Sequence, residues 1–216
     1  TQAKTLFPYT TLFRSKKITP KITKFATDAI AFISNKAIND TLIDLKNVVE
    51  FMKGNQSSSI KGLVFDNPNS STVRFMNVLA GVKAQKNERI YSFKTNEEVI
   101  KFVAQNDGMI GVVGVNWLMQ PSLEMQNVVN KVKALAVKSL TDENFYLPNQ
   151  NDLGEGKYPL ARDLYVINCQ GNSGLGMGFA SFVAGDIGQR IILKSGLLPV
   201  TMPGRRLNIR KEIINN

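Results

Sequence analysis

Residues 64–75, VFDNPNSSTVRF, carry the most specific pattern in the chain. An apolar strand is followed by a turn at Asn67-Pro68, and a helix is expected to begin just after Asn69. The first turn of a helix presents backbone N–H groups without intrahelical partners, and the helix dipole places partial positive charge there. Hydroxyls would add further donors beside these amides, from Ser70, Ser71 and Thr72. The pattern fits a site for a tetrahedral oxyanion, but ordinary helix capping by Asn or Ser is an alternative that the residues alone leave open.

Short apolar strands alternate with helices on both sides of this stretch, which indicates an α/β fold. The expected strands are residues 29–34, 61–65, 109–115, part of 128–138, and 160–168. The first expected helix is capped by Asp40 or Thr41 and ends at Gly54. The second is opened by residues 69–72 and has Phe75, Val78 and Leu79 on one side. The third is capped by Thr95, with Glu98 completing a capping box, and the fourth lies within residues 178–196.

The bulk composition is that of a globular protein, with 43% hydrophobic and 20% charged residues. No apolar run approaches the length that a bilayer span needs. The net charge of +10 favours an anionic partner, which includes nucleic acid, a small anion or an acidic surface. The basic residues are scattered, however, and their one cluster, within residues 205–211, is expected to be a solvated tail.

The chain has no His and a single Cys, Cys169. The usual zinc sites, Ser-His-Asp and Cys-His catalysis and any internal disulfide are therefore excluded. Cys169 follows a strand-like run and is expected to be a buried small apolar residue. The carboxylates near the informative segments show no paired arrangement: Asp66, Glu97, Glu98 and Asp163. We expect no catalytic residue, no metal and no cofactor, and hence a protein that is not an enzyme.

Four blocks, in order, resemble the substrate-binding proteins of phosphate ABC transporters. They are residues 27–55, TDAIAFISNKAINDTLIDLKNVVEFMKGN; the strand, turn and "SST" of residues 64–75, in place of a more usual "SGT"; residues 96–117, NEEVIKFVAQNDGMIGVVGVNW; and YPLARDLYVIN (158–168) with GFASFVAGDIGQRIILKSGLLPV (178–200). The likeness spans about residues 23–200, which single motifs would not provide.

The resemblance implies a type II periplasmic-binding-protein fold, in which two lobes close on the ligand about two crossover hinge strands. Mapped onto this chain, the crossovers are residues 26–35 and 158–168. The implied division is 16–40 for the first crossover and hinge, 41–157 for a nearly complete second lobe, 158–168 for the return crossover, and 169–216 for the C-terminal part of the first lobe.

The start of the chain has a different interpretation. Residues 5–15, TLFPYTTLFRS, match codon by codon the translation of a widely used sequencing adapter, so residues 1–15 are interpreted as a library artefact. The alternative is a natural apolar N-terminal strand. Without Lys4 and Arg14, 25 basic residues remain against 17 acidic ones, a net charge of +8. The resemblance then implies an N-terminally truncated chain, with a signal or lipoprotein segment and the rest of the first lobe expected before Lys16.

The resemblance also implies the ligand site. Ser70, Ser71 and Thr72 match the Ser-Gly-Thr that wraps the oxyanion, and Asn69 adjoins them. The family usually has an Arg four residues before the first Ser, where this chain has Asp66. A carboxylate repels an anion unless it is paired or protonated, which argues against phosphate itself. Arg74 could fold back over the site or point to solvent. On the return crossover, Tyr158 and Arg162 are candidates for the hinge or the cleft only.

The function implied is that of a monomeric receptor in the periplasm or cell envelope. It would capture phosphate or a similar oxyanion, deliver it to the permease of an ABC importer, and be held at the membrane only by an N-terminal lipid anchor. The alternative is a basic nucleic-acid or surface-interaction protein without a small-molecule ligand. For the chain as it stands, we expect weak or absent anion binding and an exposed apolar face on the incomplete lobe.

Overall fold

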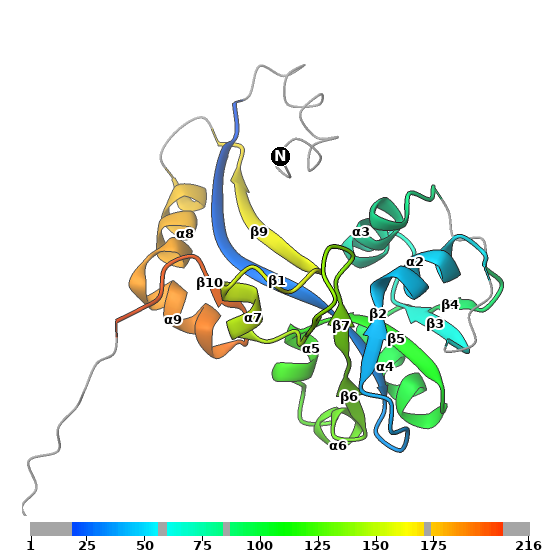
Figure 1. Cartoon of the computed structure of the whole chain (residues 1–216). Coiled ribbons are helices and arrows are strands. Elements are labelled where there is room, and N and C mark those ends of the chain that lie inside the picture. The colour runs from blue at the N-terminus through cyan, green and yellow to red at the C-terminus, as the bar shows by residue number, and fades with distance from the viewer. Residues whose placement is uncertain (1–18, 56–59, 84–86, 171–173, 205–216) are drawn as a thin grey trace, which may run out of the picture.

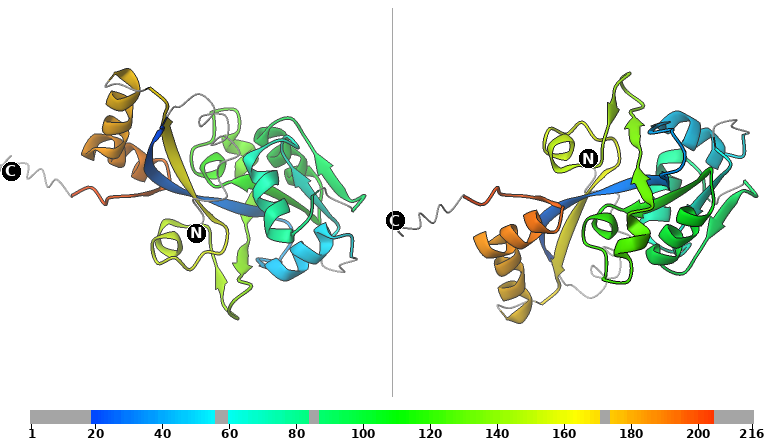
Figure 2. Two further views of the ribbon diagram at one scale, coloured as in Figure 1. Left: turned by 90° about the horizontal axis from the view of Figure 1, so that it is seen from above. Right: turned by 90° about the horizontal axis from the view of Figure 1, so that it is seen from below.

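The computed structural model describes residues 19–55, 60–83, 87–170 and 174–204. The adapter-like residues 1–15 and the basic cluster at 205–211 lie outside the described residues. Two groups of elements are joined by a pair of long strands, β1 (Lys21–Asn35) and β9 (Ala161–Asn168) (Figure 1). Viewed from above and from below, both strands run between the same two groups of helices (Figure 2).

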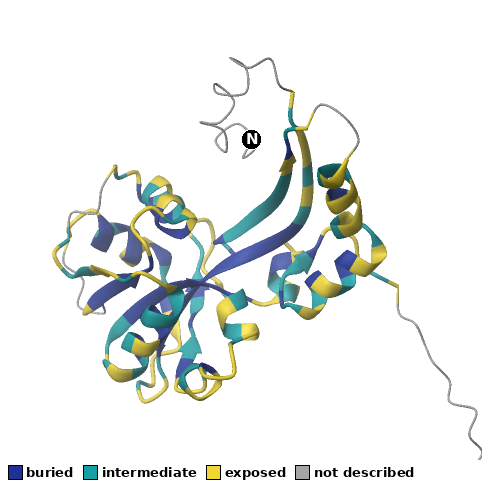
Figure 3. Ribbon diagram, turned by 180° about the vertical axis from the view of Figure 1, so that it is seen from behind, coloured by how far each residue is buried: buried dark blue, intermediate teal, exposed yellow. Residues whose placement is uncertain are grey.

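Strand β1 belongs to both groups. Its first part pairs antiparallel with β9 over Lys21–Ala29 and with β10 (Leu198–Pro199) at residues 26–27. Its second part pairs antiparallel with β5 (Met109–Gly114) and β6 (Val132–Ala134). Residues 26–34 of β1 are buried, so the strand forms the centre of the molecule (Figure 3). Two crossover strands were expected at residues 26–35 and 158–168, and β1 and β9 overlap these ranges.

The larger group is built on β5, which pairs parallel with β3 (Gly62–Phe65), as β3 does with β4 (Ile90–Ser92). The strand side chains alternate between two cores, because successive residues of a strand point to opposite faces. Phe32, Leu63 and Phe65 join one core, with residues of α2 (Leu45–Met52) and α3 (Ser71–Ala80). Ile33 and Val64 join the other, with residues of α4 (Asn96–Gln105). Helices therefore cover both faces of a largely apolar sheet, as α/β folds require.

The remaining elements of this group are short. They are α5 (Asn116–Met119), α6 (Gln126–Val129), and a second, three-stranded sheet of β2 (Leu42–Asp44), β7 (Ala136–Lys138) and β8 (Phe145–Tyr146). Helix α7 (Gln150–Gly154) follows and contacts the other group: the side-chain amide of Gln150 donates to the carbonyls of Leu193 and Leu197, at 2.8 and 2.7 Å.

The predicted start of the first helix is wrong. The residue that caps α2 is Asp44, whose carboxylate accepts from the Lys46 amide at 2.8 Å, instead of Asp40 or Thr41. Leu42, which was expected on the helix, lies in β2 and is 55% exposed. The reason is a non-local pairing: β2 runs parallel to β7, almost a hundred residues later, and this pairing holds the segment extended.

The orientation of α3 also differs from the prediction. Val78 is 74% exposed, whereas Val73 and Met76 are buried and Phe75 and Leu79 are only partly buried against the core. At α4 the prediction is confirmed, because Thr95 accepts from the Glu98 amide at 3.2 Å and Val99 and Val103 are fully buried.

The C-terminal group contains two helices where one was predicted. Helix α8 (Leu175–Ala184) ends at Gly185, and α9 (Asp186–Lys194) begins there. Buried Gln189 fixes the junction by donating to the carbonyls of Phe25 and Val183, at 2.9 and 2.8 Å. Cys169 is partly exposed, because it lies beyond the end of β9, so its predicted burial is also wrong.

Helix α8 exposes much of its apolar surface (Figure 3). Leu175 is 87%, Phe179 56% and Phe182 49% exposed, and on α9 Ile187 and Ile191 are exposed as well. A helix that is apolar on most sides is ordinarily buried. Among the described residues, no helix is long and apolar enough to cross a membrane.

Candidate functional site

The loop from β3 into α3 holds the backbone in the geometry of a helix start. The Asn67 side chain accepts from the Asn69 amide, and the Asn67 carbonyl accepts from the Ser70 amide, both at 2.8 Å. Ser70 caps α3, since its hydroxyl accepts from the Val73 amide at 3.1 Å. The Ser71 and Thr72 amides make no hydrogen bond to any residue that the structure describes. Two backbone donors are therefore free at the positive end of a ten-residue helix.

Asp66 lies behind this cap and is 7% exposed. Its carboxylate accepts from the Ser70 hydroxyl at 2.6 Å and from the Asn96 side-chain amide at 3.2 Å. Both donors are neutral, and no basic side chain in the described part of the chain forms an ion pair with Asp66. Asp66 thus links the starts of α3 and α4 where the resembled family has a cation.

A cation reaches the site from the return crossover instead. Arg162 lies directly opposite Asp28 in the β1–β9 pairing. Its Nε and Nη2 donate to one Asp28 carboxylate oxygen at 2.9 and 2.6 Å, and Asp28 is only 3% exposed. Its Nη1 donates to the Ser71 and Thr72 hydroxyls at 3.1 and 3.2 Å. One guanidinium therefore joins both crossover strands to the first turn of α3.

The end of β5 leaves room for this ion pair. A Cβ at Gly114 would lie 2.7 Å from the Asn116 side-chain oxygen, 3.2 Å from Arg162 Nη2 and 3.5 Å from an Asp28 carboxylate oxygen. The absence of a side chain at Gly114 is thus what lets the guanidinium lie between the strands and α3.

A second polar cluster occupies the opposite face of the same two strands. Asp163 accepts from the Thr27 hydroxyl at 2.8 Å, from Lys24 at 2.6 Å and from the Tyr165 hydroxyl at 3.2 Å. Partial burial raises the pKa of Asp163, but the hydrogen bonds from Lys24 and Thr27 outweigh it, so the net pKa is lowered. Among the described residues, none of these side chains forms a hydrogen bond or an ion pair with α3.

The hinge is also fixed from a third side. The buried Tyr158 hydroxyl donates to the Ile30 carbonyl at 2.7 Å. Burial raises the pKa of Tyr158, and the Asp28 carboxylate raises it further. Tyr158 is therefore a neutral donor that holds the return crossover against β1.

The structure brings together some of the sequence-predicted site residues. Ser71 and Thr72 converge on Arg162, whereas the Ser70 hydroxyl is used in the cap and in the bond to Asp66. Exposed Arg74 lies back along the helix, with Nε donating to the Ser70 carbonyl at 3.4 Å. Exposed Asn69 makes no side-chain hydrogen bond within the described residues.

Sequence reasoning missed Asp28 and gave Arg162 only a hinge or cleft role. One signal was present: Asp28 is the only charged residue in the apolar run 25–34, FATDAIAFIS. A carboxylate on a buried strand needs a cation or several donors. The sequence did not identify the partner, which is 134 residues away along the chain.

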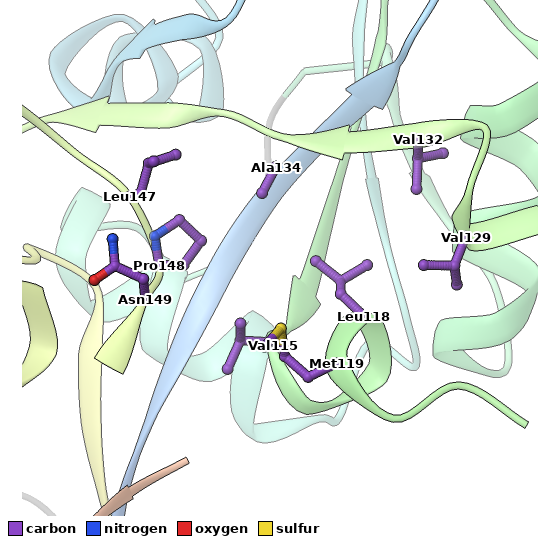
Figure 4. Close-up of a pocket in the computed structure, with 9 residues that line it drawn as sticks. All are labelled: Val115, Leu118, Met119, Val129, Val132, Ala134, Leu147, Pro148 and Asn149. Atoms are coloured by element: carbon purple, nitrogen blue, oxygen red, sulfur yellow. The ribbon is translucent and has the colours of Figure 1, made fainter. Parts of the chain in front are cut away.

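An apolar pocket lies elsewhere, between α5, α6, β6 and the residues that precede α7 (Figure 4). Its volume is about 250 Å³, and its lining is Val115, Leu118, Met119, Val129, Val132, Ala134, Leu147, Pro148 and Asn149. It contains no charged side chain and shares no residue with the start of α3, so it is unsuited to an oxyanion.

Comparisons with known proteins identify the family and the fold of the chain. Residues 10–186 match the family model of the PBP superfamily domain. No curated protein sequence matches the chain. Among solved structures, the chain is similar to one from Clostridium perfringens, which is described as a phosphate ABC transporter substrate-binding protein with bound phosphate. The two sequences are 18% identical and the TM-score is 0.64, and the match covers 84% of this chain and 72% of that one. An ABC-type phosphate transport receptor from Vibrio cholerae is 17% identical with a TM-score of 0.62, covering 83% and 72%.

A third structure is PfluDING, a high-affinity periplasmic phosphate-binding protein bound with phosphate. It is 12% identical with a TM-score of 0.63, and the match covers 89% of this chain and 73% of that one. These likenesses confirm the type II periplasmic-binding-protein fold that the sequence predicted. The family match spans most of the chain, and the protein therefore belongs to the PBP superfamily.

Proposed function

We propose that this protein is the solute-binding component of an ABC importer and that it captures phosphate or a similar oxyanion at the start of α3. The observation that carries the proposal is the first turn of α3, where the free amides of Ser71 and Thr72 adjoin two hydroxyls next to the crossover strands. Three relatives of the same fold are described as phosphate-binding or phosphate-transport proteins.

In this proposal the anion exchanges its hydration shell for fixed donors. The α3 amides and the Ser71 and Thr72 hydroxyls contact it, Ser70 holds the helix start in place, and Arg74 and Asn69 lie at the exposed side. Donors that are already in position cost little reorganisation on binding, and movement about β1 and β9 would exclude water from the site. The site contains hydrogen-bond donors and no paired acid and base, so we infer capture without chemical turnover.

The proposed cellular setting follows the relatives. PfluDING is described as periplasmic, and two others are described as ABC-transport proteins. We place this protein in the periplasm or cell envelope, as a monomer that an N-terminal lipid anchor holds at the membrane and that delivers its ligand to a permease. The division into crossovers at 16–40 and 158–168, a second lobe at 41–157 and part of a first lobe at 169–216 belongs to the same proposal.

The test is a phosphate titration of isotopically labelled protein, followed by the NMR shifts of backbone amides at constant ionic strength. We expect saturable shifts at Ser71, Thr72 and Val73, even where the affinity is only millimolar. A Ser71→Ala/Thr72→Val variant should lose the response and keep the remaining spectrum. Shifts that are absent from α3, or that spread over the basic surface and vanish as salt rises, would overturn the proposal in favour of non-specific anion binding.

A further inference from the structure

Arg162 makes contacts beyond its cross-strand partner Asp28. Its Nε and Nη2 are both held by Asp28, which leaves Nη1 to reach out of the β1–β9 pair. Nη1 lies 3.1 Å from the Ser71 hydroxyl and 3.2 Å from the Thr72 hydroxyl. Arg162 therefore contacts the two hydroxyls that the proposed function assigns to the ligand.

The direction of these bonds determines what the hydroxyls can do next. A guanidinium only donates, so both hydroxyl oxygens act as acceptors towards Arg162. Each hydroxyl then still has its own proton to donate to a further acceptor; Ser71 is exposed, whereas Thr72 is only 3% exposed. The positive charge behind the oxygens strengthens those outward donors, since hydrogen bonds that involve an ionised group are stronger than neutral ones.

Resting on the proposed function, we propose that Arg162 is the residue that positions Ser71 and Thr72 as donors to the oxyanion, through a guanidinium that Asp28 holds against α3. Asp28 holds the guanidinium in place, and Gly114 gives it room. Arg162 acts through the two hydroxyls and is thus a positioning residue.

The experiment is the amide titration with inorganic phosphate applied to four variants. Arg162→Gln should weaken phosphate binding about tenfold or more, as expected for loss of a charged hydrogen-bonding partner. Arg162→Lys should recover part of the affinity, because it keeps the charge but loses the planar fork. Asp28→Asn/Arg162→Gln removes both charges, leaves no unpaired carboxylate, and should bind as weakly as Arg162→Gln. The matched control is Lys24→Gln, which removes a cation from the opposite face of the same strands and should bind like wild type.

A double-mutant cycle separates positioning from a general effect of charge. In a Ser71→Ala/Thr72→Val background, adding Arg162→Gln should change phosphate binding less than twofold, because the residues act as one unit. The inference is overturned if wild-type α3 responds to phosphate but the Arg162→Gln variant binds phosphate as tightly as the Lys24→Gln control. It is also overturned if Arg162→Gln weakens phosphate binding as much in the Ser71→Ala/Thr72→Val background as in wild type. If wild-type α3 does not respond at all, the proposed function fails, and this inference fails with it.

Discussion

The ion pair at the hinge yields a sharp stability prediction. Asp28 and Arg162 side chains are 4% and 18% exposed. Replacing Arg162 by Met keeps the apolar stem but leaves the Asp28 carboxylate, within the described residues, with one remaining hydrogen bond, from the Ala29 amide at 2.8 Å. Breaking one side of a buried pair costs about 3–5 kcal/mol, and we expect about 3 kcal/mol because water still reaches the Arg162 side.

The double variant Asp28→Asn/Arg162→Met should cost much less, about 1 kcal/mol, because no buried charge remains uncompensated. The assay is urea unfolding at neutral pH, followed by circular dichroism. The matched control is a double-mutant cycle on the more exposed pair Lys24 and Asp163, whose side chains are 39% and 25% exposed. The coupling free energy between Lys24→Met and Asp163→Asn should stay below about 1 kcal/mol. A loss below about 1 kcal/mol for Arg162→Met, or additive effects of the two hinge substitutions, would refute the reasoning.

Three further predictions follow from single contacts. Gly114→Ala should lower the free energy of unfolding by about 1–3 kcal/mol, measured by urea unfolding, because the new Cβ would lie 2.7 Å from the Asn116 side-chain oxygen and 3.2 Å from Arg162 Nη2; an unchanged stability would contradict this. Tyr158→Phe should cost about 1 kcal/mol by losing the bond to the Ile30 carbonyl. Because the folded pKa of Tyr158 is raised, its contribution should be constant below about pH 10 and fall as pH rises further, so wild type and variant should converge only in strong alkali. Leu175→Ser/Phe179→Ser should reduce binding of an apolar fluorescent dye and change stability by less than about 0.5 kcal/mol, because both side chains are already exposed; a large loss of stability would show that they are packed.

Local patterns predicted the elements that depend on local chemistry. The buried strand at residues 29–34, the cap at Thr95 and the helix start at Ser70 all lie where the sequence indicated. Each is fixed by neighbours along the chain, either by an apolar run or by a side chain that bonds a nearby amide.

Non-local contacts explain where the sequence was insufficient. Leu42 was assigned to a helix because nothing nearby shows its parallel pairing with β7. The helix within residues 178–196 divides at Gly185 because Gln189 is bonded to β1, far away in the sequence. The cation of the candidate site was missed for the same reason, since only the β1–β9 register places Arg162 opposite Asp28.

The most direct test of the anion site is a crystal structure with arsenate, a tetrahedral oxyanion whose heavy atom is located by anomalous scattering. We predict one strong peak within hydrogen-bond distance of the Ser71 and Thr72 amides and hydroxyls, on the side of α3 that faces β9. A peak only in the apolar pocket, only on scattered lysines, or nowhere at millimolar arsenate would contradict an oxyanion site at the start of α3.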